Sequence, residues 1–188
     1  GTYSRIHLPH VALEADGIQR AFGHRAAKYS NISVNRLVEL LHGKRIWFFP
    51  GHGDALLVSE PVLAFERDGQ VEAVSIDTLV NVVKPFASKG LELVVLTGCC
   101  TARLGAALRE SAEVPHVICW ETQVDDAAAK IFGEALAWDL ALQRSNLQPE
   151  LAFGSACTAV TLETEPGQLD TGSSARVQKF ELNVDPND

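Results

Sequence analysis

The sequence predicts an α/β sandwich in which a mostly parallel central sheet is flanked by helices. Short apolar runs at 45–49, 92–97 and 115–120 alternate with longer segments whose apolar residues recur at helical spacing. An apolar run this short, bounded by Gly or Pro, is typical of a strand buried on both faces. Because strands that alternate with helices form parallel sheets covered by helices, we expect three layers. The length of 188 residues indicates a single domain, 1–188.

Capping residues and apolar periodicity predict the individual elements. The N-terminal part is expected to form a strand at 3–8 closed by Pro9, a helix at 12–22, an edge strand at 25–29 and a helix at 34–41 capped by Ser33. A hairpin follows, with strands at 62–65 and 71–74. Further helices are expected from Asp77, at 102–111, from Val124 or Asp125 to Leu142, and at 150–162, where a helix is preferred over a strand. The polar stretch 163–176 is predicted to be a mobile loop, and 177–184 a last edge strand.

The composition excludes several classes of protein. There are 16 Lys and Arg against 24 Asp and Glu, so the net charge is −8 and the pI about 5.2. Nucleic-acid binding requires a basic face and is not expected, whereas an acidic surface attracts basic peptides. Apolar stretches are shorter than the ~18 residues of a membrane span, and no signal peptide is recognisable, which predicts a cytoplasmic protein. The four cysteines fit neither a disulfide framework nor zinc-ligand spacing, so no metal or cofactor is expected.

Two apolar runs end in small residues followed by a reactive side chain. His52 lies between two glycines in the segment RIWFFPGHGD (45–54). Cys99 and Cys100 follow Gly98 in the segment LELVVLTGCCTAR (91–103). If the two strands lie side by side in a parallel sheet, both ends reach the edge where open α/β sheets bind ligands. A histidine and a cysteine at that edge form the minimal arrangement of a thiol nucleophile with a base.

Each motif has a plainer structural interpretation. A cysteine at a strand end is usually a small buried hydrophobe, and a histidine between glycines is compatible with a simple tight turn. Either motif alone is more often structural than functional. The functional interpretation is preferred because His52 and Cys99 follow matching strands, with a helix-length segment between them.

The order of these motifs resembles the caspase-like cysteine peptidases, a group that includes caspases, metacaspases, gingipains, separases and CHAT domains. The CHAT domain is the most similar. LVVLTGCCTARLG resembles its strand ending in Ser-Ala-Cys-Glu-Thr, which aligns the family's nucleophile with Cys99 rather than Cys100. VPHVICWETQVDDAAAKIFGEAL resembles its block of Val-Pro, strand, Trp, Val-x-Asp and helix. The similarity covers roughly residues 8–160.

The resemblance implies a caspase-like fold and a cysteine endopeptidase that works with a catalytic dyad. Cys99 would attack the peptide carbonyl, and His52 would act as base or protonate the leaving amine. The helix that follows would favour the thiolate through its dipole. The backbone amides of Gly53 and Cys99 would form the oxyanion hole.

Acidic residues after the third apolar run suggest the specificity. The Val-x-Asp pattern aligns Asp126 with the residue that receives a basic P1 side chain, which predicts cleavage after Arg or Lys. Asp125 and Glu121 are expected to contribute, although paired carboxylates at a helix start are often only dipole partners. Trp120 is equally compatible with core packing and with a pocket wall.

Three features depart from the family pattern. CHAT domains usually carry additional N-terminal strands, so we expect that portion to be missing; a processed enzyme and a reduced version are the alternatives. Cys100 replaces the usual glutamate. Activation by processing, by a partner such as helical repeats, or by calcium would act on 54–74 or 163–176, with Arg67 or Arg176 as an autoprocessing site.

Two other functions remain open. A caspase-like fold that has lost catalysis would serve as a binding or scaffolding module, but such a module has no need of both His52 and Cys99. A different thiol enzyme, such as an acyltransferase or a redox protein using Cys99 and Cys100, is the other alternative. The redox version is the weakest because adjacent cysteines rarely form a disulfide without strain.

Overall fold

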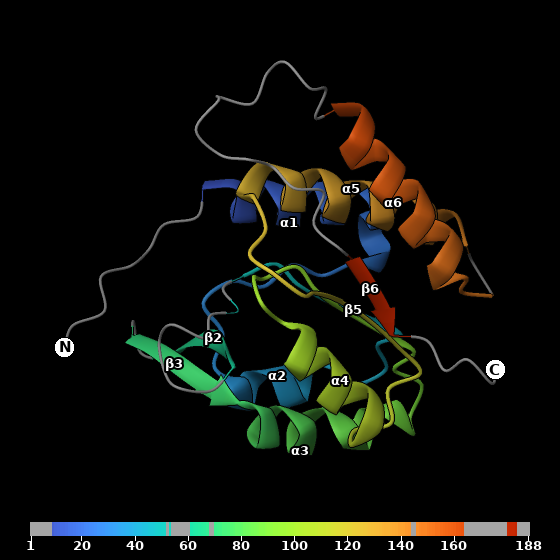
Figure 1. Ribbon diagram of the computed structural model, residues 1–188. Coiled ribbons are helices and arrows are strands. Elements are labelled where there is room, and N and C mark those ends of the chain that lie inside the picture. Colours follow the sequence, from blue (N-terminus) through green and yellow to red (C-terminus); the bar gives the residue numbers. More distant parts are fainter. Residues whose placement is uncertain are drawn as a thin grey trace. The chain divides into compact units, whose positions relative to one another are not determined.

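The computed structural model describes residues 9–51, 53, 61–67, 70–143, 146–163 and 180–183 (Figure 1). The contacts within the chain divide it into two compact units, and the prediction of one domain stays a prediction. The first unit comprises Gly1–His7, Tyr29–Gln123 and Phe180–Asp188, and the second comprises Leu8–Lys28 and Val124–Lys179. Each unit is described by itself. No helix within the described ranges has the length and apolar character needed to cross a membrane.

The first unit is built on a sheet whose strand order is β1-β4-β5-β6. Its described elements are α2 (Val34–Leu40), β1 (Ile46–Phe49), β2 (Val62–Arg67), β3 (Gln70–Ser75), α3 (Ile76–Ala87), β4 (Leu93–Leu96), α4 (Ala102–Glu110), β5 (His116–Trp120) and β6 (Phe180–Asn183). Strands β1, β4 and β5 are parallel, and β6 pairs with β5 in the antiparallel direction at the edge. The prediction of a mostly parallel sheet flanked by helices is confirmed.

The register of β1 against β4 decides which residues meet at the carboxyl edge. Ile46 lies opposite Leu93 and Phe49 opposite Leu96. At the other end of the pair, Arg45 binds Glu92 through two hydrogen bonds, with Nε–Oε1 at 2.6 Å and Nη2–Oε2 at 2.9 Å. The two strands therefore end together, and the loops that follow them leave the sheet side by side.

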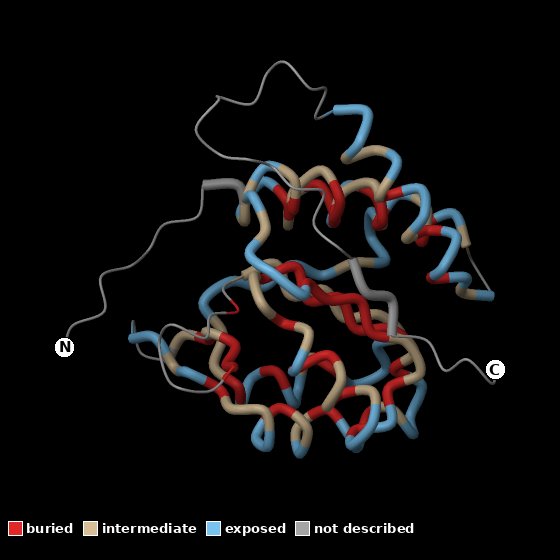
Figure 2. Tube along the Cα trace, in the orientation of Figure 1, coloured by how far each residue is buried: buried red, intermediate tan, exposed pale blue. Residues whose placement is uncertain are grey.

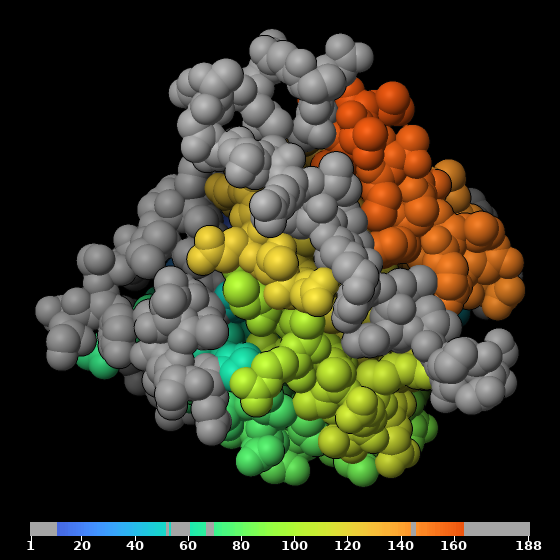
Figure 3. Space-filling model, in the orientation of Figure 1, coloured from blue at the N-terminus to red at the C-terminus, as the bar shows by residue number. Residues whose placement is uncertain are grey.

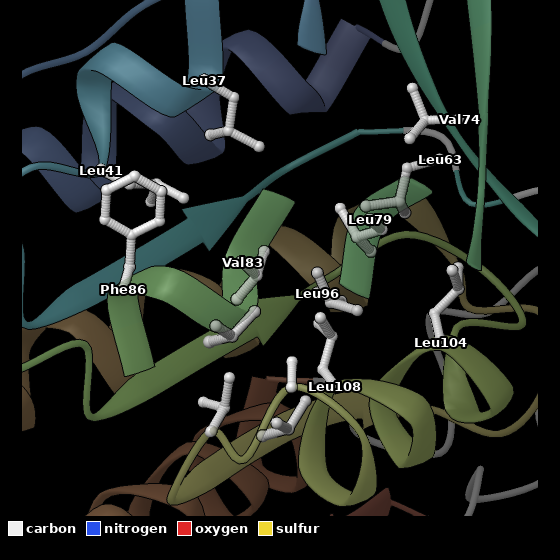
Figure 4. Close-up of a cluster of buried hydrophobic side chains, with 14 of the residues drawn as sticks. Leu37, Leu41, Leu63, Val74, Leu79, Val83, Phe86, Leu96, Leu104 and Leu108 are labelled. Atoms are coloured by element: carbon white, nitrogen blue, oxygen red, sulfur yellow. The ribbon is translucent and has the colours of Figure 1, made fainter. Parts of the chain in front are cut away.

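A hydrophobic core lies between helices α2, α3 and α4 and one face of the sheet (Figure 4). Alternate residues of the strands, such as Val94 and Leu96 of β4, point into this core. Leu93 and Val95, on the opposite face of β4, are also completely buried. The expectation of a strand buried on both faces is thus confirmed, and the central strands stand out as buried in Figure 2. Helices α3 and α4 form part of the outer surface (green to yellow-green in Figure 3).

Local capping determines where two of these helices begin. The Ser33 hydroxyl accepts a hydrogen bond from the Arg36 amide, as predicted for the start of α2. Ser75 caps α3 in the same way through the Thr78 amide, so α3 begins at Ile76 rather than at Asp77. The predicted hairpin is confirmed as β2 and β3, which pair in the antiparallel direction.

The second unit is helical in its described part. It contains α1 (Pro9–Phe22), a short 3-10 turn (Gly23–Arg25), α5 (Asp126–Leu142) and α6 (Pro149–Glu163). Helix α5 packs against both α1 and α6, with its buried face formed largely by Ala, Leu and Phe. The helix preferred for 150–162 is confirmed as α6.

One prediction for the N-terminal region is wrong, and others fall outside the described residues. Helix α1 begins at Pro9, earlier than the predicted start at Ala12, because proline is well suited to the first turn of a helix. The strand expected at 25–29 does not form: Gly23, with φ of 57°, ends α1, and the Arg25 guanidinium donates to the Ala141 carbonyl over 2.7 Å. The stretches 3–8 and 164–176 lie outside the described residues. Of the predicted 177–184 strand, 180–183 is confirmed as β6.

Candidate active site

The loops after β1 and β4 touch through their backbones at the carboxyl edge of the sheet. A Cβ placed on Gly98 would overlap the Gly51 carbonyl oxygen and lie 2.5 Å from the Gly53 amide nitrogen. A Cβ placed on Gly53 would lie 2.7 Å from the Cys99 carbonyl oxygen. Only glycines permit so close an approach. Gly51 and Gly53 of the loop after β1 are therefore packed directly on Gly98 and Cys99.

The two predicted catalytic residues differ in what the structure describes. Cys99 is half-buried and lies in the short turn between β4 and α4. His52 lies outside the described residues, but both glycines that flank it are described, and Gly53 is buried. Gly53, a predicted oxyanion-hole donor, also forms an isolated antiparallel bridge with Leu63 of β2. The hairpin is thereby connected to the loop that contains His52.

Backbone strain is located next to Cys99, at Cys100. Cys100 has φ of 53°, a left-handed conformation that costs a residue with a side chain roughly 1–2 kcal/mol. Its amide donates a hydrogen bond to the Thr122 carbonyl over 3.0 Å, which ties the turn to the loop after β5. Strained backbone of this kind is concentrated at functional sites. The Cys99 and Gly53 amides stay the predicted oxyanion donors.

The sequence analysis missed Thr101, which organises this turn. Thr101 is completely buried and its hydroxyl contacts the Leu96 and Gly98 carbonyls and the Trp120 amide. In the sequence, a threonine just before a predicted helix is typical of an ordinary N-cap. The further signal was that Thr101 aligns with the threonine of the Ser-Ala-Cys-Glu-Thr motif, to which no role was given. Thr97 was also missed; it is buried and both its amide and its hydroxyl donate to the Phe49 carbonyl of β1.

The residues at the end of β5 are placed at the same edge of the sheet. Trp120 is only 2% exposed, which favours core packing over the pocket-wall alternative. Glu121 follows it and is exposed. Because β5 is parallel to β4, Glu121 leaves the sheet at the edge that carries Cys99. A role for Glu121 toward substrate stays a prediction.

The two aspartates predicted for specificity belong to the second unit. Asp125 is the N-cap of α5, and its Oδ1 accepts hydrogen bonds from the Ala127 and Ala128 amides over 3.0 and 3.1 Å. The helix-start interpretation is therefore confirmed for Asp125. Asp126 is half-buried in the first turn of α5. Their roles in recognising a basic side chain stay predictions.

The cap predicts how substitutions of Asp125 affect stability. Asp125→Ala is expected to lower the free energy of unfolding by about 1 kcal/mol, because two helix-end amides lose their acceptor. Asp125→Asn should preserve stability, since asparagine caps as well as aspartate. Urea unfolding of the two variants and the wild type measures both effects. If the Asn variant were as destabilised as the Ala variant, the carboxylate charge and not the cap would be the stabilising feature.

All four cysteines lie in the described part of the chain, and none of them is paired in a disulfide. Cys119 is buried, as expected for a core residue, and its sulfur lies against Gly105 of α4. Cys157 is half-buried on α6, and this burial raises the pKa of its thiol. Among the described side chains, no group of three or more His, Cys, Asp and Glu residues is arranged to hold a metal ion.

The chain matches no protein-family model, and no curated protein matches it.

Proposed function

We propose that this protein is a caspase-like cysteine endopeptidase with His52 and Cys99 as its catalytic dyad. The observation that carries the proposal is the parallel pairing of β1 with β4. It brings the two loops that the sequence singled out into backbone contact, at Gly53 and Gly98. The half-buried position of Cys99 leaves part of this residue accessible, as a nucleophile requires.

The proposed reaction proceeds in two steps. The Cys99 thiol gives its proton to His52 as its sulfur attacks the scissile carbonyl, and the negative charge that develops on the carbonyl oxygen is stabilised by the amides of Gly53 and Cys99. His52 protonates the leaving amine as the C–N bond breaks, which leaves an acyl-enzyme thioester. Water then attacks the thioester, and His52 accepts its proton. The free acid leaves as His52 returns this proton to the Cys99 sulfur, which restores the thiol.

We propose that the substrate carries Arg or Lys at P1. The support is the Val-x-Asp pattern ending at Asp126 together with the acidic character of the chain, which has a net charge of −8. A carboxylate that receives a guanidinium forms two charge-assisted hydrogen bonds and so prefers Arg over neutral side chains. Glu121 and Asp125 would add to the negative potential that attracts such a substrate.

A fluorogenic peptide series that differs only at P1 tests this function. Turnover is expected after Arg or Lys and not after Asp or Leu. Asp126→Asn is expected to lower kcat/KM for the Arg substrate by roughly 10²- to 10³-fold, the effect of removing one partner of a desolvated ion pair. Asp139→Asn is the matched control, because it makes the same change further along α5 and should leave kcat/KM unchanged.

The alternative outcomes separate the parts of the proposal. Turnover after Asp would retain the peptidase and contradict the role of Asp126. Turnover of no peptide, together with a Cys99 that resists an arginyl chloromethylketone, would instead support a binding or scaffolding module. Rapid inactivation by that reagent, with its label on Cys99, would support a basic-specific peptidase.

A further inference from the structure

Thr101 occupies the N-cap position of α4 but does not cap the helix. Threonine at this position usually accepts a hydrogen bond from one of the first helical amides, which stabilises the helix. Here no side-chain cap hydrogen bond forms, and φ and ψ are −90° and 1°, outside the extended region that capping residues adopt. The hydroxyl is used elsewhere.

The Thr101 hydroxyl instead contacts three backbone groups around Cys99. Its oxygen lies 3.2 Å from the Leu96 carbonyl oxygen, where β4 ends, and 3.0 Å from that of Gly98, just before Cys99. It also accepts a hydrogen bond from the Trp120 amide, at the end of β5, over 3.1 Å. A hydroxyl has one proton and two lone pairs, so it donates toward the carbonyls while it accepts from Trp120.

The methyl group of the same side chain packs on the other loop. A Cβ placed on Gly53 would overlap Thr101 Cγ2. Gly53 follows His52 in the chain. One completely buried side chain therefore contacts the ends of β4 and β5 through its hydroxyl and the loop after β1 through its methyl group.

We infer that Thr101 is the positioning residue of the site, with its hydroxyl holding the Cys99 turn and its methyl group holding Gly53 in the loop after β1. The inference rests on the proposed peptidase function only where turnover is measured. Positioning matters to catalysis because an error of about 1 Å in the placement of a reacting group can cost roughly 10²-fold in rate. Thr101 does not touch the reacting atoms and is not itself catalytic.

Stepwise truncation separates the two contacts without adding atoms to a buried site. Thr101→Ser removes the methyl group, and Thr101→Ala removes the hydroxyl as well. All proteins carry Cys100→Ser, so that Cys99 is the only thiol in the tryptic peptide 90–103. The readouts are the pH profile of Cys99 alkylation by iodoacetamide, kcat and KM for the Arg peptide, and thermal unfolding.

The two variants are expected to differ in how strongly they change the alkylation of Cys99. Thr101→Ser should lower kcat and change the alkylation profile of Cys99 less than Thr101→Ala does, because it loses only the methyl contact with Gly53 and retains every hydroxyl contact. Thr101→Ala should alter the alkylation profile and lower kcat by roughly 10²-fold with little change in KM. Thr97→Ala is the matched control: its hydroxyl bonds a carbonyl that the Thr97 amide already satisfies, so the alkylation profile should stay that of the wild type.

Several results would overturn the inference. A folded Thr101→Ala variant with the wild-type alkylation profile and kcat would remove the positioning role. Should Thr101→Ala not fold, Thr101→Ser still decides, because it loses only the methyl contact with Gly53: a lowered kcat with little change in KM supports the role, and a wild-type kcat together with a wild-type alkylation profile contradicts it. If the wild type cleaves no peptide, the proposed function fails, whereas the alkylation series still decides the role of Thr101.

Discussion

Cys99→Ala is expected to abolish peptide cleavage, lowering kcat by at least about 10⁴-fold, because without the sulfur no acyl-enzyme can form. The loss should occur without a change in fold, since Cys99 is half-buried and makes up one residue of a turn held by neighbouring backbone hydrogen bonds. Initial rates with the Arg peptide, with thermal unfolding measured in parallel, provide the test.

The adjacent Cys100 provides the matched control. Cys100→Ser is expected to retain most of the activity, because the Cys100 amide, and not its sulfur, ties the turn to Thr122. Serine retains a small polar side chain at this strained position, where φ is 53°. The opposite result, an inactive Cys100→Ser and an active Cys99→Ala, would transfer the nucleophile to Cys100. If Cys99→Ala and Cys100→Ser both retained the wild-type activity, the protein would not use thiol catalysis.

Gly98→Ala is expected to damage both stability and activity. The added methyl group would meet the Gly51 carbonyl and the Gly53 amide, which belong to the backbone and have no rotamer that relieves the overlap. Inserting a methyl group into such a contact costs about 1–3 kcal/mol of unfolding free energy. Separation of the two loops would in addition lower kcat by roughly 10²-fold. Urea unfolding and peptide turnover measure the two effects.

Gly154 of α6 offers a control for the same substitution. No atom lies within 4 Å of a Cβ placed there, and the residue is exposed on a helix. Gly154→Ala should therefore raise the unfolding free energy by about 0.5–1 kcal/mol, the difference in helix propensity between the two residues. Wild-type stability of Gly98→Ala would contradict the close contact of the two loops. This test matters for the family resemblance, because the CHAT motif has alanine at the position of Gly98.

The elements predicted with the greatest accuracy were those with local signals. The apolar runs of β1, β4 and β5 and the serine that caps α2 depend on neighbouring residues only, and each prediction is confirmed within one or two residues. The prediction failed at 25–29, where an edge strand was expected. There Arg25 contacts the Ala141 carbonyl, which is 116 residues away in the chain, and no local pattern indicates such a contact.

Sequence alone determined that the chain forms a parallel sheet with helices and that His52 and Cys99 each follow a strand. Hydrophobic periodicity and the residues that end a strand are local features, so a short stretch of sequence reveals them. Only the tertiary structure decided that the β1 and β4 loops touch through Gly53 and Gly98, and that the Thr101 side chain contacts both loops instead of capping α4. Register and close backbone contacts arise from pairing between distant segments, so no local pattern specifies them.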